Sequence, residues 1–223
     1  MRPIATRKTT KELVYDQLKR GILNGTISKD EYLTEMKLAE TLNISRTPIR
    51  EAAADLENEG LLVHVQRKGF KIREINESEL EQIFYLRNSI EMKGISILID
   101  TINNSQVNQL EAIVDLQEEA IKMDDRIKYI ELDQSFHRTM LRMAGQNLLE
   151  QIFKEIYNLS LLIGHAAITK EGRMDEVILE HREIIESLRN KDENGAKNHL
   201  NKHLEETGKS AKKKFYLQLQ NKQ

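Results

Sequence analysis

Residues 42–52 read LNISRTPIREA, and this stretch decides the fold of the first third of the chain. Asn43-Ile44-Ser45 is too short for anything except a tight turn, and Ser45 can cap a helix that begins at Arg46. Pro48 is tolerated in the first helical turn, because its missing N–H group would be unpaired there in any case. The helix should end at 58–60 and bury one apolar face, formed by Ile49, Ala52, Ala53 and Leu56.

Two helices and a hairpin surround this segment. Apolar residues at helical spacing predict a first helix over Lys11–Leu23, and a segment beginning at Leu33 predicts a second that ends near Asn43. Downstream, the β-rich runs 61–65 and 70–72 enclose a basic turn at 66–69, which predicts a hairpin. Three helices with a short turn before the third, followed by a hairpin, predict a winged helix-turn-helix domain over residues 1–75.

The third helix and the hairpin turn carry side chains suited to duplex DNA. Arg46, Thr47 and Arg50 lie on the first turns of that helix, and arginine can donate to O6 and N7 of guanine together. Arg67, Lys68 and Gly69 form the turn, where glycine lets the backbone approach a phosphate or the minor groove. The alternative is that these basic residues are merely solvated.

The rest of the chain, residues 76–223, shows no strand signal and predicts a mainly α protein. A polar connection at 73–78 contains Asn76 and Ser78, either of which can cap the next helix. Six helical segments follow, separated by short polar or glycine-containing breaks. We expect an all-helical six-helix bundle domain with helices at about 79–100, 104–122, 125–144, 147–167, 172–190 and 192–218.

Composition narrows the function classes. The 223 residues are 39% hydrophobic and 31% charged, as expected for two soluble domains. The absence of cysteine excludes disulfides, thiolate metal sites and a cysteine nucleophile. No signal peptide and no apolar stretch long enough to span a bilayer are seen, so we expect a cytoplasmic protein without a membrane partner. Residues 1–75 hold 14 Lys+Arg and 11 Asp+Glu, a basic excess that suits phosphate binding only weakly.

Histidines and one aspartate suggest a metal site in the helical part. Asp133 and His137 are four residues apart, so they share one helix face, and His181 and His203 come from the last two helices. One carboxylate and three imidazoles suit zinc, nickel or manganese with positions left for a ligand. His199 and His203 form an alternative pair four residues apart, and each histidine taken alone is more often structural or exposed.

The first part of the chain resembles the GntR family of regulators. The resemblance rests on LAE at 38–40, LNISRTPIREA at 42–52, LENEGL at 56–61 and RKGF at 67–70. Many family members have an arginine near the start of the second helix, where this chain has Met36-Lys37, and that contact is assigned to Lys37. The resemblance implies operator DNA as partner and contacts from Lys37, Ser45, Arg46, Thr47, Arg50, Arg67 and Gly69.

The helical part resembles the FCD effector domain of the FadR subfamily. The matching segments are DQSFH at 133–137, AGQN at 144–147, EHREI at 180–184, and Ala196 seven residues before His203, and six helices resemble the VanR-like branch. The resemblance implies a divalent metal, most simply zinc, held by Asp133, His137, His181 and His203, whereas His165 and His199 do not fit. Arg87 and Glu91 match the family's R-x-x-x-E segment, whose arginine can pair with an effector carboxylate. The alternative for Arg87 is an ion pair with Glu91 on the helix surface.

Together these patterns predict a transcriptional regulator, expected to be a repressor, that binds operator DNA as a homodimer and responds to a small organic acid. No catalytic residue is predicted. One alternative is a metal-dependent hydrolase or isomerase, although no general base is evident near the four metal ligands. Another is a regulator for which the metal itself is the signal.

Overall fold

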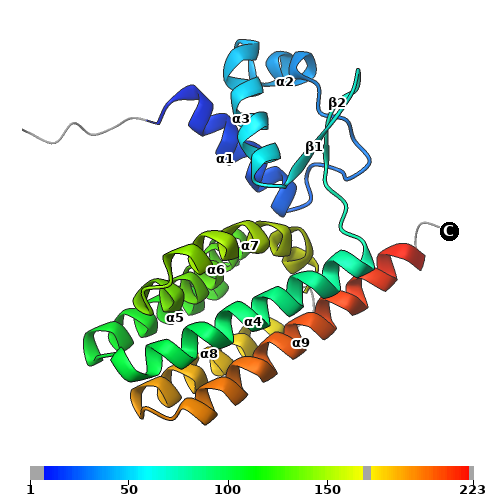
Figure 1. Cartoon of the computed structure of the whole chain (residues 1–223). Coiled ribbons are helices and arrows are strands. Elements are labelled where there is room, and N and C mark those ends of the chain that lie inside the picture. The colour runs from blue at the N-terminus through cyan, green and yellow to red at the C-terminus, as the bar shows by residue number, and fades with distance from the viewer. Residues whose placement is uncertain (1–7, 168–171, 221–223) are drawn as a thin grey trace, which may run out of the picture. The chain divides into compact units, whose positions relative to one another are not determined.

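The computed structural model describes residues 8–167 and 172–220 and divides the chain into two compact units, 1–74 and 75–223. Figure 1 labels their helices and strands. The first unit contains α1 (Thr10–Leu23), α2 (Glu35–Leu42), α3 (Arg46–Asn58), β1 (Leu62–Val65) and β2 (Gly69–Ile72). The second contains α4 (Glu77–Thr101), α5 (Asn104–Lys122), α6 (Arg126–Met143), α7 (Asn147–Ala167), α8 (Arg173–Arg189) and α9 (Glu193–Gln220).

The core of the first unit lies between α1 and α3, which pack against each other. Thr9 and Glu12 form a capping box that starts α1. The inward face of α3 is as expected from its spacing, with Ile49 and Leu56 fully buried together with Ala52 and Ala53. This packing fixes which edge of α3 faces outward, and the basic residues of the helix lie on that edge.

The turn between α2 and α3 follows the predicted sequence, but its details differ. Asn43 adopts the left-handed conformation at φ 51° and ends α2. Ser45 occupies the N-cap position of α3, yet its side chain makes no capping hydrogen bond. The α2 segment does not begin at Leu33, because Leu33 exchanges two backbone hydrogen bonds with Phe70 and Thr34 caps the helix. Leu33 is therefore a strand-like residue that attaches to the hairpin.

The hairpin is antiparallel, with Leu62 opposite Ile72 and Val65 opposite Gly69. Its three-residue turn places Arg67 in the left-handed conformation at φ 65°. Gly69 has φ +99°, and a β-carbon added there would lie 2.5 Å from the carbonyl oxygen of Leu33. The glycine is thus required by the close approach of Leu33 to the hairpin, a reason that the sequence alone did not suggest.

The second unit is built from the six helices that were predicted, and Figure 1 shows α4 and α9 running along each other. Side-chain caps begin four of them, from Asn76, Asn103, Asp125 and Asp192. Helix α5 packs against both α6 and α8, and α8 packs against α9, while α4 and α7 each contact α6 and α9 and complete the bundle around a buried centre. In the ranges described, no helix combines the length and apolar character needed to cross a membrane.

Gly69→Ala should destabilise the first unit more than Gly25→Ala. Both glycines have positive φ, which costs an L-residue about 1–2 kcal/mol, but only Gly69 has a backbone atom in the way. We expect the Gly69 variant to lose measurably more free energy of unfolding than the Gly25 variant in urea titrations monitored by circular dichroism. Equal losses would contradict the steric role of the Leu33 carbonyl.

Candidate functional site

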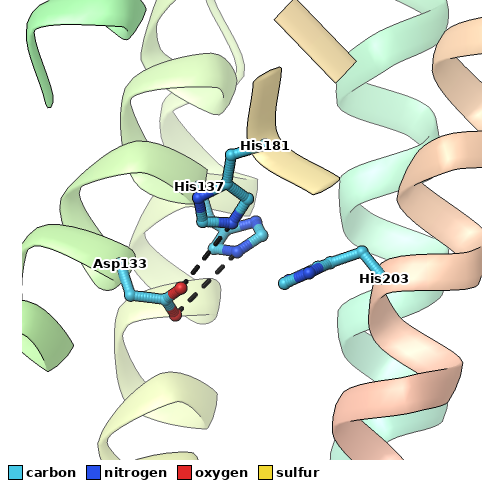
Figure 2. A group of neighbouring side chains, drawn as sticks. All are labelled: Asp133, His137, His181 and His203. Atoms are coloured by element: carbon cyan, nitrogen blue, oxygen red, sulfur yellow. Dashed lines mark ion pairs between the residues drawn. The ribbon is translucent and has the colours of Figure 1, made fainter. Parts of the chain in front are cut away.

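Four predicted metal ligands come together in the second unit. Asp133 and His137 lie on α6, His181 on α8 and His203 on α9, and Figure 2 shows them facing one another. One donor atom from each lies within 4.8 Å of the others. Nε2 of His181 is 3.6 Å from Asp133 Oδ1, and Nε2 of His137 is 4.0 Å from Asp133 Oδ2. Two donors bound to one zinc ion stand about 3.4 Å apart, so this spacing fits a single metal ion.

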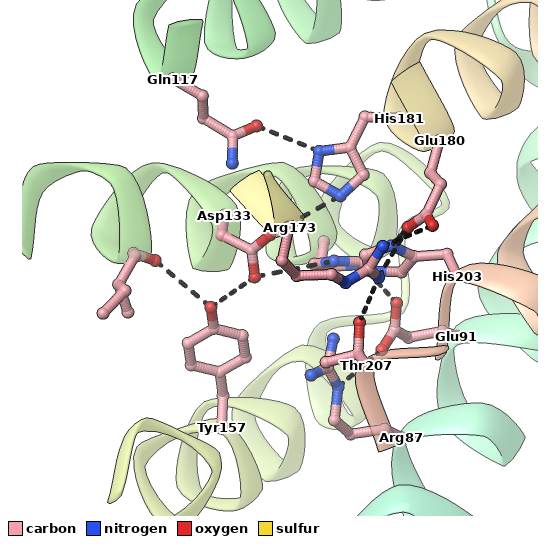
Figure 3. Close-up of polar contacts among 12 residues, drawn as sticks. Arg87, Glu91, Gln117, Asp133, Tyr157, Arg173, Glu180, His181, His203 and Thr207 are labelled. Atoms are coloured by element: carbon pink, nitrogen blue, oxygen red, sulfur yellow. Dashed lines mark hydrogen bonds and ion pairs between the residues drawn. The ribbon is translucent and has the colours of Figure 1, made fainter. Parts of the chain in front are cut away.

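The other ring nitrogen of His181 and that of His203 are each held by a side-chain oxygen (Figure 3). Nδ1 of His203 is 2.7 Å from Glu180 Oε2, and Nδ1 of His181 is 3.0 Å from Gln117 Oε1. Nδ1 of His137 lies 2.5 Å from Glu91 Oε2 as an ion pair.

These contacts orient the rings as metal sites require, with Nε2 left for the ion. Nε2 of His137 and Nε2 of His181 are buried and find no hydrogen-bond partner among the described residues. Unpaired nitrogens in the interior are costly, and a metal ion would satisfy both. The residues present therefore fit a divalent cation.

Burial controls the charges in this centre. Burial, aided by the neighbouring imidazoles, lowers the pKa of His181 well below its usual value, and burial also lowers the pKa of His203. Burial alone would raise the pKa of Glu91, but His137 and Arg87 outweigh it and lower that pKa to about 2. Neutral imidazoles at His181 and His203 are in the protonation state that binding of a metal ion needs.

Arg87 is buried with Glu91, not exposed on a helix surface as one interpretation of the sequence had it. The two side chains are only 3% and 1% exposed, and Arg87 Nε donates to Glu91 Oε1 over 3.1 Å. The guanidinium carbon lies 5.3 Å from the Tyr157 ring centre and 5.7 Å from that of Phe153. Within the described chain Nη2 of Arg87 has no hydrogen-bond partner, so it remains available as a donor.

A cavity of about 50 Å³ adjoins the cluster and shares Asp133 and His203 with it. Its polar lining also includes Arg87, Tyr129, Tyr157 and Arg173, and its apolar lining includes Phe84 and Val177. The Tyr129 hydroxyl is buried and has no partner in the described ranges, whereas Tyr157 donates to Asp133 over 2.7 Å. The cavity therefore offers two unpaired donors, on Arg87 and Tyr129, beside the four-residue cluster.

Sequence reasoning missed Arg173, Tyr129 and Tyr157 in this lining. Arg173 binds Glu180 through both of its Nη atoms, at 2.6 and 2.9 Å, and also Thr207. The seven-residue spacing of Arg173 and Glu180 on one helix face was the available signal. The tyrosines gave no signal, because aromatic residues at helical spacing are typical of any core.

Two other histidines were named in the sequence analysis. His199 is not part of the four-residue cluster, and its Nδ1 lies 3.1 Å from Ser187 Oγ. The side chain of His165 lies outside those that the structure describes. The alternative pairing of His199 with His203 therefore has no geometric support.

The residues predicted to contact DNA lie on the surface of the first unit. Ser45, Arg46, Thr47 and Arg50 are exposed along the outward edge of α3, while Ile49 between them is fully buried. Lys37 in α2 and Arg67 in the hairpin turn are also exposed. Sequence reasoning missed Glu35, which binds both Arg46 and Arg50.

Comparison with known proteins gives consistent matches to both units. The family described as "Bacterial regulatory proteins, gntR family" matches residues 10–72, and the FCD domain matches residues 82–206. The chain is 30% identical over 191 residues to the HTH-type transcriptional regulator YdhC of Bacillus subtilis (strain 168), covering 85% of each chain. It is 28% identical over 192 residues to the gluconate operon transcriptional repressor of Bacillus licheniformis, covering 84% of this chain and 79% of that one.

Among solved structures, E. coli McbR/YncC is similar with a TM-score of 0.76. The match covers 94% of this chain and 100% of that chain at 18% sequence identity. This likeness concerns the fold.

The metal-free protein should lose stability as the pH falls below about 6.5. The folded pKa of His181 is lowered, so the unfolded chain binds a proton that the folded chain does not, and stability falls by up to about 1.4 kcal/mol per pH unit for this group. Between pH 7.5 and 5.5, urea unfolding in EDTA should show His181→Gln losing about 1 kcal/mol less than the wild type. The control His64→Gln, which removes an exposed imidazole, should behave as the wild type; identical losses in all three proteins would contradict the assignment.

Proposed function

Because the chain belongs to the GntR family of bacterial regulatory proteins and carries an FCD domain, we propose that it is a cytoplasmic repressor whose operator affinity is set by a small organic acid bound beside a metal ion. It is a DNA-binding transcriptional regulator and not an enzyme, like the relatives that it matches. Relatives that are repressors, among them the gluconate operon transcriptional repressor of Bacillus licheniformis, support the direction of regulation proposed here.

The observation that carries the DNA-binding proposal is the outward edge of α3. Arg46 and Arg50 are 61% and 63% exposed on a helix whose opposite face is fixed in the core by Ile49 and Leu56. Such an edge can enter the major groove, where arginine reads guanine, while Thr47 and Ser45 can reach a phosphate or a thymine methyl group. Lys37, Arg67 and the hairpin backbone at Gly69 are proposed to contact the sugar-phosphate backbone.

One recognition helix reads too few bases for useful specificity, so we propose a homodimer on a palindromic operator. The two α3 helices of such a dimer would occupy half-sites about one helical turn of DNA apart. For acid binding to control operator binding, the acid must prefer one arrangement of the dimer. The acid then changes the affinity for the operator by the same factor by which the operator changes the affinity for the acid.

Asp133, His137, His181 and His203 would hold the metal ion, most simply zinc, with nickel or manganese as alternatives. When bound, the ion would supply a Lewis-acidic anchor for a carboxylate oxygen. Arg87 would donate its unpaired Nη2 to the same acid, and the hydroxyl of Tyr129 would be the second donor in the cavity. The cavity volume of about 50 Å³ favours a small acid.

Arg50→Ala should weaken operator binding about 10- to 100-fold, because a bidentate arginine contact contributes about 1–3 kcal/mol of base discrimination. Its metal content should be unchanged, since Arg50 lies in the other unit. Fluorescence anisotropy with a labelled operator and elemental analysis of the same preparation measure both. Arg20→Ala, which removes one exposed positive charge from α1, is the control; loss of metal in the Arg50 variant would refute the division of roles.

Zinc added to EDTA-treated protein should raise the free energy of unfolding by about 2.7 kcal/mol at a concentration 100 times its dissociation constant. Asp133→Asn should lose most of this gain because it removes the one anionic ligand, whereas His199→Ala should retain it. Thermal melts across a zinc titration measure the effect. An equal loss in the His199 variant would place the metal elsewhere, and operator affinity that follows zinc with no acid present would make the metal itself the signal.

A further inference from the structure

Glu35, the first residue of α2, binds the two exposed arginines of α3. Its Oε1 accepts from Arg50 Nε over 2.8 Å, and its Oε2 accepts from Arg50 Nη2 over 2.9 Å. The same Oε2 accepts from Arg46 Nη2 over 3.0 Å and from Arg46 Nε over 3.3 Å. One carboxylate on a separate helix therefore holds both guanidinium groups by the same edge.

The contacts leave a particular part of each arginine free. Glu35 occupies the Nε–Nη2 edge, and the N–H groups on Nη1 and the second one on Nη2 remain at the far end of the guanidinium. That end carries two parallel donors, which is the arrangement that O6 and N7 of guanine accept. Arg50, held through two separate oxygens, is the better fixed of the two side chains.

We propose that Glu35 is a positioning residue for sequence recognition, which fixes Arg50 and Arg46 so that their free Nη ends meet guanine in the major groove. The inference rests on the proposed DNA-binding function and names a residue that sets its specificity. An arginine that is already held loses less conformational freedom when it binds a base than one that moves in solvent.

Glu35 also has an electrostatic effect that works against indiscriminate binding. Hydrogen bonds from Arg50 and Arg46 lower the pKa of Glu35 to about 2, so the carboxylate stays charged. It is only 20% exposed, compared with 61% for Arg46 and 63% for Arg50. A fixed negative charge behind the arginines weakens the attraction of phosphates that any DNA sequence offers. Glu35 thus favours base recognition over general phosphate binding.

An ordinary surface ion pair would do neither of these things. Single exposed pairs contribute little to stability, and their loss changes neither base preference nor salt dependence in a specific way. The structure offers such a pair on the same helix for comparison, because Asp55 of α3 binds Lys11 of α1 with 43% of its side chain exposed. Asp55→Asn and Glu35→Gln each remove one negative charge from the first unit, and the former is the matched control.

The experiment uses the full chain and the duplex that the wild type selects from a random pool, with a scrambled duplex of equal composition. Glu35→Gln cannot accept from both arginines with both of its side-chain atoms, because one is now a donor. We expect the ratio of selected to scrambled affinity to fall about tenfold or more, while affinity for the scrambled duplex rises. Asp55→Asn should keep the ratio within about twofold, because Asp55 touches neither arginine.

A second measurement tests the contact itself. Each guanine of the selected half-site is replaced in turn by 7-deazaguanine, which lacks N7. At least one replacement should weaken wild-type binding several-fold yet weaken Glu35→Gln binding much less, because the arginine is no longer aimed at that atom.

The possible results distinguish a failure of the role of Glu35 from a failure of the proposed DNA-binding function. A wild type that selects no duplex refutes the DNA-binding proposal. A wild type that selects one, with an unchanged affinity ratio and equal 7-deazaguanine effects in Glu35→Gln, refutes only the role of Glu35. A fall in melting temperature without a change in the ratio would likewise make Glu35 a structural contact between α2 and α3.

Discussion

Three imidazoles buried together impose a constraint that much of the helical unit satisfies. Each ring has two nitrogens, and a buried nitrogen without a partner costs free energy. One nitrogen of each ring faces a side chain from α4, α5 or α8, and Nε2 of His137 and of His181 lie 4.0 and 3.6 Å from the carboxylate on α6. Because His203 comes from α9, five helices meet at a single polar centre. Their packing and the geometry of this centre cannot be altered independently.

The first unit keeps its charged groups at the surface, whereas the helical unit buries several at its centre. Its core is apolar and closes between α1 and α3, so the charged groups of α3 remain in solvent. The basic side chains are ordered there by a neighbouring carboxylate instead of by burial. Polar groups at the centre of the helical unit and on the surface of the first unit are thus fixed by the same means, a hydrogen-bonded partner from another helix.

The sequence predicted the helices, the hairpin and the pairing of Asp133 with His137 because their signals are local or periodic. Ser45-Arg46-Thr47-Pro48 defines a turn and a helix start within a few residues, and Asp133 and His137 share a face by spacing alone. What could not be predicted depends on contacts between distant segments. The pairing of Leu33 with Phe70, the sharing of Glu35 by two arginines and the burial of Arg87 against Tyr157 each join residues whose separation has no fixed period. The metal-ligand set as a whole came from a family resemblance, since spacing left His199 as an alternative.

The carboxylate of Glu91 contacts both Arg87 and His137. One of its oxygens accepts from Arg87 and the other faces His137, so a single carboxylate balances a guanidinium in the cavity wall and an imidazole in the cluster. Any redistribution of charge on one side alters the electrostatic field felt by the other. The cavity wall and the four-residue cluster therefore share one charged side chain, so a charge bound beside either group would act electrostatically on the other.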